Sequence, residues 1–260
     1  MENLFQKLLK KPPSKKEENI WCFGKEENGD YFEETDILQW RNGLFEENWK
    51  RAEDLENNAT NHIINEIVKN KKIVIDLASG PGMGLIPSIK QIDASFPCVA
   101  SDANSTVLKE WKQYLEKNQV VRQLDFAQFS IFDIPFKDNS VDAYSSYIGI
   151  SSTRNGNDGY NQALKEIHRT LADGGMLFCV ESEWNNVPEI INLFEKNNMQ
   201  TWDCFKEEQV TWHERFIENG FEILFEKPCV YHGLNKDDNE LGKLAFESNV
   251  NIGITFTAYI

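Results

Sequence analysis

The stretch that decides the fold is Val74-Ile75-Asp76-Leu77-Ala78-Ser79-Gly80-Pro81-Gly82-Met83-Gly84. It is an apolar strand that runs directly into a glycine-rich turn and then into a predicted helix over residues 85–92. Glycines permit positive φ values and let a ligand approach without Cβ atoms in the way, and the following helix N-terminus offers free amides. The pattern predicts a turn that binds a cofactor; a tight strand-to-helix turn without a ligand is the alternative.

The spacing of the glycines narrows the choice of cofactor. Gly80, Gly82 and Gly84 form GxGxG, and Leu85 stands where the dinucleotide fingerprint GxGxxG has its third glycine. Asp102 closes the next predicted strand, where an ionised carboxylate can accept hydrogen bonds from both hydroxyls of a ribose. Such an acid suits either cofactor class, so it does not discriminate between them, whereas the glycine spacing disfavours a dinucleotide.

From Lys72 onward, short apolar runs alternate with helix-like stretches, which is the pattern of βαβ units. We expect strands over residues 73–77, 97–101, 121–129, 141–147, 176–181, 221–231 and 252–259. We expect helices over residues 85–92, 105–117, 159–171, 187–198 and 210–219. The sequence therefore predicts an α/β fold with a seven-stranded, mostly parallel sheet, helices on both faces and an antiparallel last strand.

The chain before residue 70 has a different texture. Apolar and aromatic side chains recur at helical spacings over residues 32–49 and 58–69, between positions rich in Asn and Glu. We expect residues 1–70 to form an N-terminal helical extension that covers the cofactor as a lid, because a segment of this size has little core of its own. Residues 71–260 are expected to form the cofactor-binding domain.

Two later segments complete a set of four motifs. Asp133-Ile134-Pro135-Phe136-Lys137-Asp138-Asn139-Ser140-Val141-Asp142 is similar to D-x-P-F-x-D-x-S-F-D, and Glu166-Ile167-His168-Arg169-Thr170-Leu171-Ala172-Asp173-Gly174-Gly175 is similar to E-x-x-R-x-L-x-x-G-G. Together with the glycine-rich turn and Asp102, they resemble class I S-adenosylmethionine-dependent methyltransferases in order and spacing, over about residues 72–181.

This resemblance implies a Rossmann-like fold, S-adenosylmethionine as cofactor, and a role for particular positions. The implied cofactor-binding residues are Asp76, Ala78, Ser79, Gly80, Pro81 and Gly82 beside the methionine part, Asp102 and Ala103 at the ribose, Asp133 and Ile134 at the adenine, and Tyr147 near the sulfonium. For Asp133, a helix or turn cap is the alternative. His168 and Arg169 match a helix that is usually structural in the family.

The acceptor pocket is expected beyond the carboxyl ends of the strands, where this class of fold binds its ligands. Candidate substrate-binding residues are Tyr31, Phe32, Trp40, Arg154 and Tyr160. The three N-terminal aromatics could equally pack their helices against the core, and Arg154 could form a surface salt bridge instead of meeting an anionic acceptor.

Methyl transfer from a sulfonium is an in-line displacement that requires alignment rather than a protein nucleophile. A general base is conceivable among His62, His213, His232, Asp158 and Tyr160, but their spacing selects none, so the catalytic residues stay unassigned.

The net charge of the chain limits the kinds of molecule that it is expected to bind. The formal net charge is -15, from 27 basic and 42 acidic residues, which disfavours nucleic acid and favours a small-molecule methyl acceptor. The five cysteines never show CxxC spacing, so we expect reduced cytoplasmic thiols and no metal site.

No apolar run is long enough to cross a membrane, and the first residues reverse the order of a secretory signal. The oligomeric state is not indicated.

Two alternatives to a small-molecule methyltransferase remain at this point. One is a non-catalytic relative that keeps the cofactor pocket and acts as a regulatory or interaction protein. The other is an NAD(P)-dependent oxidoreductase, which the missing third glycine and the segment from Asp133 to Asp142 disfavour.

Overall fold

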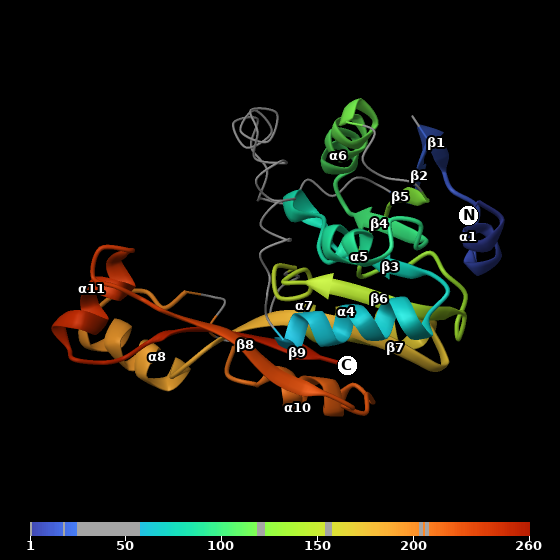
Figure 1. Ribbon diagram of the computed structural model, residues 1–260. Helices are drawn as coiled ribbons and strands as arrows, with labels where there is room; N and C mark the ends of the chain where they lie inside the picture. The colour runs from blue at the N-terminus through green and yellow to red at the C-terminus, as the bar shows by residue number, and fades with distance from the viewer. Residues whose placement is uncertain are drawn as a thin grey trace.

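The computed structural model describes residues 2–17, 19–24, 58–118, 123–153, 158–202, 205 and 208–260. Within these residues the chain forms one mixed sheet in the order β1-β2-β5-β4-β3-β6-β7-β9-β8 (Figure 1). The strands are β1 Lys15–Glu17, β2 Ile20–Cys22, β3 Val74–Asp76, β4 Cys98–Asp102, β5 Leu124–Gln128, β6 Val141–Tyr147, β7 Leu171–Trp184, β8 Glu226–Gly233 and β9 Gly253–Tyr259.

Helices cover both faces of the sheet. They are α1 Glu2–Leu8, α4 Asn58–Asn70, α5 Ile86–Ile92, α6 Ser105–Asn118, α7 Gly159–Thr170, α8 Val187–Lys196, α10 Trp212–Glu218 and α11 Glu240–Glu247. One apolar cluster joins α4, α5 and α6 to one face, with Ile63, Ile67 and Trp111 fully buried. A second cluster joins α7 and α10 to the other face, with Leu164 and Ile167 fully buried. Burial of these helical stripes holds the layers together.

The path of the chain creates a switch point at β3. β3 pairs in parallel with β4 on one side and with β6 on the other. The chain runs outward through β4 to β5 and then crosses back to place β6 on the opposite side of β3. The segments that follow β3 and β6 therefore diverge, and the crevice between them is where folds of this class bind ligands.

The predicted fold class is confirmed: the sheet is mostly parallel, with β9 antiparallel to both β7 and β8. The number of strands was predicted wrongly, because β1 and β2 extend the seven expected strands to nine in the described part of the chain. β2 pairs in parallel with β5 and antiparallel with β1, so residues 15–17 and 20–22 of the N-terminal segment are strands and not helices. The three-residue run Ile20–Cys22 is too short to show a periodic pattern of apolar residues. Its pairing with β5 stabilises it.

A third apolar cluster lies between α8 and α11 in the carboxyl-terminal part of the chain. The strands β7, β8 and β9 extend away from the main helices to support α8 and α11 (Figure 1). The apolar side chains of Ile190, Phe194 and Leu241 are buried in this separate cluster. The helices expected from the sequence do not include α11, whose buried residues are Leu241, Gly242 and Ala245.

Some expectations are not tested by this structure. The helix expected over residues 32–49 lies outside the described residues, as do residues 25–57 of the lid expected over residues 1–70. The division of the chain at residue 70 stays a prediction. Within the described residues, no helix combines the length and the apolar character that a membrane span requires.

Candidate cofactor-binding site

The glycine-rich loop leaves β3 with an unusual backbone. Left-handed φ angles occur at Ala78 (45°), Gly80 (54°), Met83 (56°) and Gly84 (54°). A Cβ atom added to Gly80 or to Gly82 would find no other atom within 4 Å. One side of the loop backbone is therefore open, and a ligand can approach it closely.

The Asp76 carboxylate occupies the other, inner side of the loop. Asp76 is fully buried, and its Oδ2 accepts a hydrogen bond of 2.7 Å from the Ser79 hydroxyl. Its Oδ1 accepts hydrogen bonds from the Ser145 hydroxyl at 2.6 Å and the Leu85 amide at 3.3 Å. A Cβ atom on Gly84 would overlap this carboxylate, so a glycine is needed there. Asp76 thus acts from beneath the loop and does not face its open side.

Asp102 holds the outer edge of the same loop. Its Oδ2 accepts a hydrogen bond of 2.9 Å from the Gly80 amide, and its Oδ1 accepts one of 2.9 Å from the Asn104 amide. The indole of Trp111 on α6 donates to the Gly80 carbonyl at 3.1 Å. Burial raises the pKa of Asp102, while the amide hydrogen bonds oppose that shift. Next to it, the Ala103 carbonyl accepts a hydrogen bond from the Gln128 side chain.

The exit of β6 packs against the exit of β3. Ile148 has a left-handed φ of 59°, and a Cβ atom on Gly149 would lie 2.6 Å from the Leu77 carbonyl oxygen. This close approach brings half-buried Tyr147 to the carboxyl end of the sheet beside the loop. Tyr147 is the last residue of β6, and its place near the sulfonium stays a prediction.

The sequence analysis missed Glu181, a fully buried carboxylate near the carboxyl end of β7. It accepts hydrogen bonds from the Ser146 hydroxyl at 2.7 Å and the Ser151 amide at 2.9 Å, and so fixes the connection after β6. Burial raises the pKa of Glu181 to about 6. The signal was available, because Glu181 directly follows the apolar run from Leu177 to Val180.

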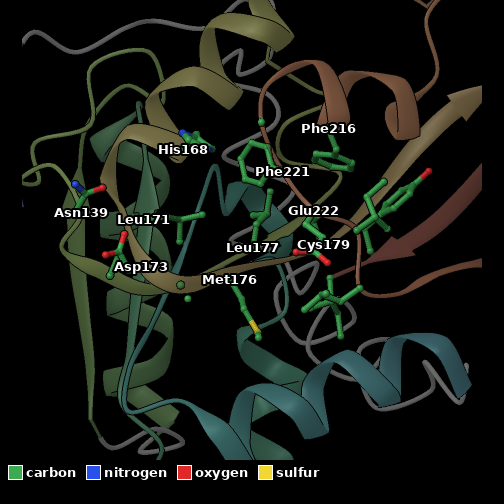
Figure 2. A pocket seen from close by; sticks show the side chains of 18 residues that line it. Asn139, His168, Leu171, Asp173, Met176, Leu177, Cys179, Phe216, Phe221 and Glu222 are labelled. Atoms are coloured by element: carbon green, nitrogen blue, oxygen red, sulfur yellow. The ribbon is translucent and has the colours of Figure 1, made fainter.

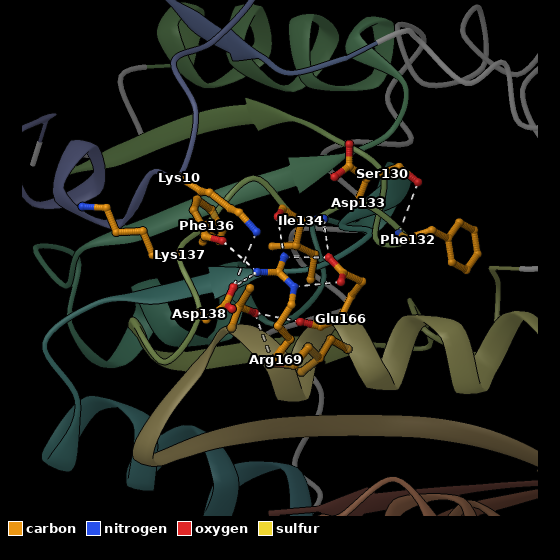
Figure 3. A network of polar contacts seen from close by, with 12 residues as sticks. Lys10, Ser130, Phe132, Asp133, Ile134, Phe136, Lys137, Asp138, Glu166 and Arg169 are labelled. Atoms are coloured by element: carbon orange, nitrogen blue, oxygen red, sulfur yellow. Dashed lines mark hydrogen bonds and ion pairs between the residues drawn. The ribbon is translucent and has the colours of Figure 1, made fainter.

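A polar network fixes the segment that the family resemblance assigns to the adenine (Figure 3). Arg169 on α7 donates to both carboxylate oxygens of Glu166, at 2.8 and 2.7 Å, and to the carbonyls of Ile134 and Phe136. Glu166 in turn accepts the Ile134 amide at 3.1 Å. The guanidinium fork matches these acceptors in one plane, so the pair holds both backbone groups of Ile134.

Asp133 itself lies at the surface beside the N-terminal segment. Its carboxylate forms a 2.8 Å ion pair with Lys11, and its side chain is 71% exposed. The Lys10 amide donates to the Pro135 carbonyl at 2.9 Å, and the Lys137 amide donates to the Leu8 carbonyl at 2.8 Å. The residues that follow α1 therefore line this segment, with Ile134 buried beneath.

Of the candidate substrate-binding residues, only Tyr160 lies within the described chain; Tyr31, Phe32, Trp40 and Arg154 do not. Tyr160 is buried at the start of α7. Its hydroxyl lies 3.0 Å from the Ser151 carbonyl and 3.1 Å from a Glu208 carboxylate oxygen, and its ring packs 5.1 Å from that of Trp212. Tyr160 thus anchors the connection after β6 and underlies the expected acceptor side.

A family model described as the ubiE/COQ5 methyltransferase family matches residues 51–202, more than half of the chain. The chain belongs to this family. This is a family of class I S-adenosylmethionine-dependent methyltransferases, and the predicted cofactor is confirmed at the level of the family. Membership also overturns the oxidoreductase alternative.

Individual relatives agree with the family. A ubiquinone/menaquinone biosynthesis C-methyltransferase UbiE from Bartonella tribocorum is 29% identical over 122 residues, which are 47% of this chain and 45% of that protein. The chain thus spans about half the length of such curated relatives. A putative methyltransferase from Bacillus halodurans has a TM-score of 0.52 and 17% identity, over 75% of this chain and 96% of that chain. A putative S-adenosyl-L-methionine-dependent methyltransferase from Methanococcus maripaludis has a TM-score of 0.51 and 17% identity, over 90% and 96%. These two likenesses show the fold.

The residues present fit S-adenosylmethionine. The open space at Gly80 and Gly82 gives a ligand access to the loop backbone. Each Asp102 oxygen accepts one backbone amide and keeps lone pairs for further donors, such as ribose hydroxyls.

Asp76→Asn should gain stability relative to the wild type as the pH rises. Burial raises the pKa of Asp76 from 3.8 to about 7, so the folded protein retains this proton between about pH 4 and 7, where the unfolded chain has lost it. The wild-type contribution is present at low pH and falls by up to about 1.4 kcal/mol per pH unit as the pH rises toward 7. Asn keeps the shape and does not titrate. Urea unfolding of both proteins from pH 5 to pH 8 measures the difference.

Asp237→Asn is the control for this series, because Asp237 is exposed. A difference between Asp76→Asn and wild type that stays constant over the pH range would contradict the buried, protonated state of Asp76.

Arg169→Lys should loosen the segment from Ile134 to Phe136. A single ammonium cannot replace the guanidinium fork, so the hydrogen bonds to the two carbonyls are lost. We expect the free energy of unfolding to fall by about 1–3 kcal/mol, and hydrogen exchange at the Ile134 amide to accelerate. Lys10→Gln removes only an exposed ammonium 3.7 Å from Asp138 and should change stability by less than about 0.5 kcal/mol. Equal effects of the two substitutions would refute the positioning role of Arg169.

Proposed function

We propose that this protein transfers a methyl group from S-adenosylmethionine to a small-molecule acceptor by in-line displacement. The observation that carries the proposal is the meeting, at one switch point, of an open glycine loop, the Asp102 carboxylate and the exit of β6. The strongly acidic composition supports a small acceptor over nucleic acid.

Each part of the site has a role in this proposal. Asp102 receives the ribose hydroxyls, and the backbone from Ala78 to Gly82, including Ser79 and Pro81, faces the methionine part. Asp133 and Ile134 receive the adenine, and Tyr147 lies near the sulfonium. Asp76 supports binding indirectly, because its carboxylate already accepts hydrogen bonds from Ser79, Ser145 and Leu85.

The bound cofactor supplies an activated methyl group on a good leaving group. The protein has to align the acceptor with it and exclude water. Glu181 and Tyr160 contribute by fixing the connection after β6, since both bind Ser151. We assign no general base.

The names of the curated relatives supply the first acceptors to test. They are C-methyltransferases of ubiquinone and menaquinone biosynthesis, so precursors of these quinones belong in the first panel. Methylation of any small molecule in the panel also separates the proposal from a non-catalytic relative, which would bind the cofactor without turnover. A cytoplasmic location stays part of the proposal.

Asp102→Ala should weaken binding of S-adenosylmethionine by about 1–3 kcal/mol, the usual cost of losing hydrogen bonds to a charged partner. Isothermal titration calorimetry with the cofactor and with its demethylated product measures the loss. Because Asp102 also accepts the Gly80 amide, Asp102→Asn serves as a second variant that keeps one side-chain acceptor. Wild-type affinity in a folded Asp102→Ala protein would disprove the ribose role.

Gly82→Val should abolish cofactor binding and leave the fold intact. The backbone at Gly82 is not left-handed, and a Cβ there meets nothing in the protein, so the new side chain occupies only the ligand's space. Gly84→Ala is the contrasting variant, since its Cβ would overlap Asp76 and should lower stability instead. Circular dichroism with calorimetry separates the two effects. Retained binding in Gly82→Val would place the cofactor elsewhere.

A further inference from the structure

A cavity of about 350 Å³ opens at the amino end of β7 (Figure 2). Its walls come from the end of α7, the turn into β7, the end of α10 with the chain that follows it, and the end of β9. The glycine loop, Asp102 and the exit of β6 lie at the carboxyl ends of the strands, and none of them lines the cavity. This space is therefore separate from the cofactor site, and the inference drawn from it does not rest on the proposed function.

Aromatic rings form one wall of the cavity. Phe216 packs against Phe221 with ring centroids 5.8 Å apart and against Tyr259 at 5.1 Å. The imidazole of His168 packs edge-on against Phe221 at 5.3 Å. Leu177 and Cys179, both buried, add further apolar surface. Because each ring is fixed by its neighbour, the wall is formed before any ligand arrives.

Two carboxylates and one imidazole, that of His168, belong to the side chains that line the cavity. Asp173 and Glu222 line it, and its lining includes no Lys or Arg. The two carboxylates belong to different segments; in the view of Figure 2, Asp173 lies on the side of Leu171 and Glu222 on the side of Phe216. Lys71 is not among the lining residues, and its ammonium lies 3.5 Å from the carbonyl oxygen of the lining residue Gly174. Carboxylates beside aromatic rings favour a cation that carries an apolar body.

We propose that this cavity is a second ligand site, which binds a small amphipathic cation of the aromatic-amine class. The volume lies near the lower end of the range for small-molecule pockets, roughly 300–1,000 Å³, so a peptide side chain or a compact amine fits better than a larger cofactor. The aromatic wall receives the apolar body, and Asp173 and Glu222 face the ammonium group.

The test uses 2-phenylethylamine, which is protonated at neutral pH, and its neutral isostere 2-phenylethanol. Titration of the full-length protein is followed by the backbone amide resonances of Gly174, Gly175 and Gly220, which line the cavity. We expect saturable shifts with a Kd on the order of millimolar, as for a fragment of this size, and weaker binding of the alcohol. The amides of Gly80 and Gly82 report on the cofactor loop and should not move.

Charge removal sharpens the test. The double variant Asp173→Asn/Glu222→Gln changes two exposed side chains and should fold normally. It should weaken binding of the amine about fivefold, as expected for exposed charges, and leave the alcohol unaffected. Glu195→Gln on distant α8 is the matched control. Absence of saturable shifts at the cavity amides, shifts confined to the cofactor loop, or equal affinity for amine and alcohol would each overturn the proposal.

Discussion

The Asp76 carboxylate lies inside the sheet without access to solvent, and three structural elements meet at its two oxygens. The glycine loop donates through Ser79, the neighbouring strand β6 donates through Ser145, and the chain before α5 donates through the Leu85 amide. A buried carboxylate that lost these partners would destabilise the protein by several kcal/mol. The hydrogen bonds of Asp76 therefore hold the loop, the strand and the helix in a fixed arrangement at the switch point.

The same device recurs around the site. Asp102 accepts the Gly80 amide, Glu166 accepts the Ile134 amide, and Glu181 accepts the Ser151 amide. The carboxyl oxygens of Asp and Glu accept hydrogen bonds, so these side chains suit the free amides where strands end and loops begin. This chain uses four acidic side chains, each from a different strand or helix, to hold the loops that surround the crevice. These four acidic residues thus have a structural role in addition to their contribution to the net negative charge.

The sequence predicted the parts of the molecule that follow a period or a motif. The strand-loop-helix from Val74, the parallel sheet and the antiparallel last strand all follow from local patterns that survive in the structure. It could not predict β1 and β2, whose three-residue runs carry no period and depend on the edge of β5 for stability. It also could not show that Asp76 faces inward, because that depends on Ser145, which is 69 residues away and meets Asp76 only through strand register.

The acceptor side is assembled differently from the cofactor side. The family match ends at residue 202, before α10, yet Trp212 of α10 packs on Tyr160 and donates its indole hydrogen to the Ser182 carbonyl of β7. Tyr160 in turn contacts Ser151 in the connection after β6. The surface next to the crevice is thus shaped jointly by a matched segment and an unmatched one. A residue inside the family match and a helix beyond it thus hold the connection after β6 together, so a change in α10 would alter this connection without touching the glycine loop or Asp102.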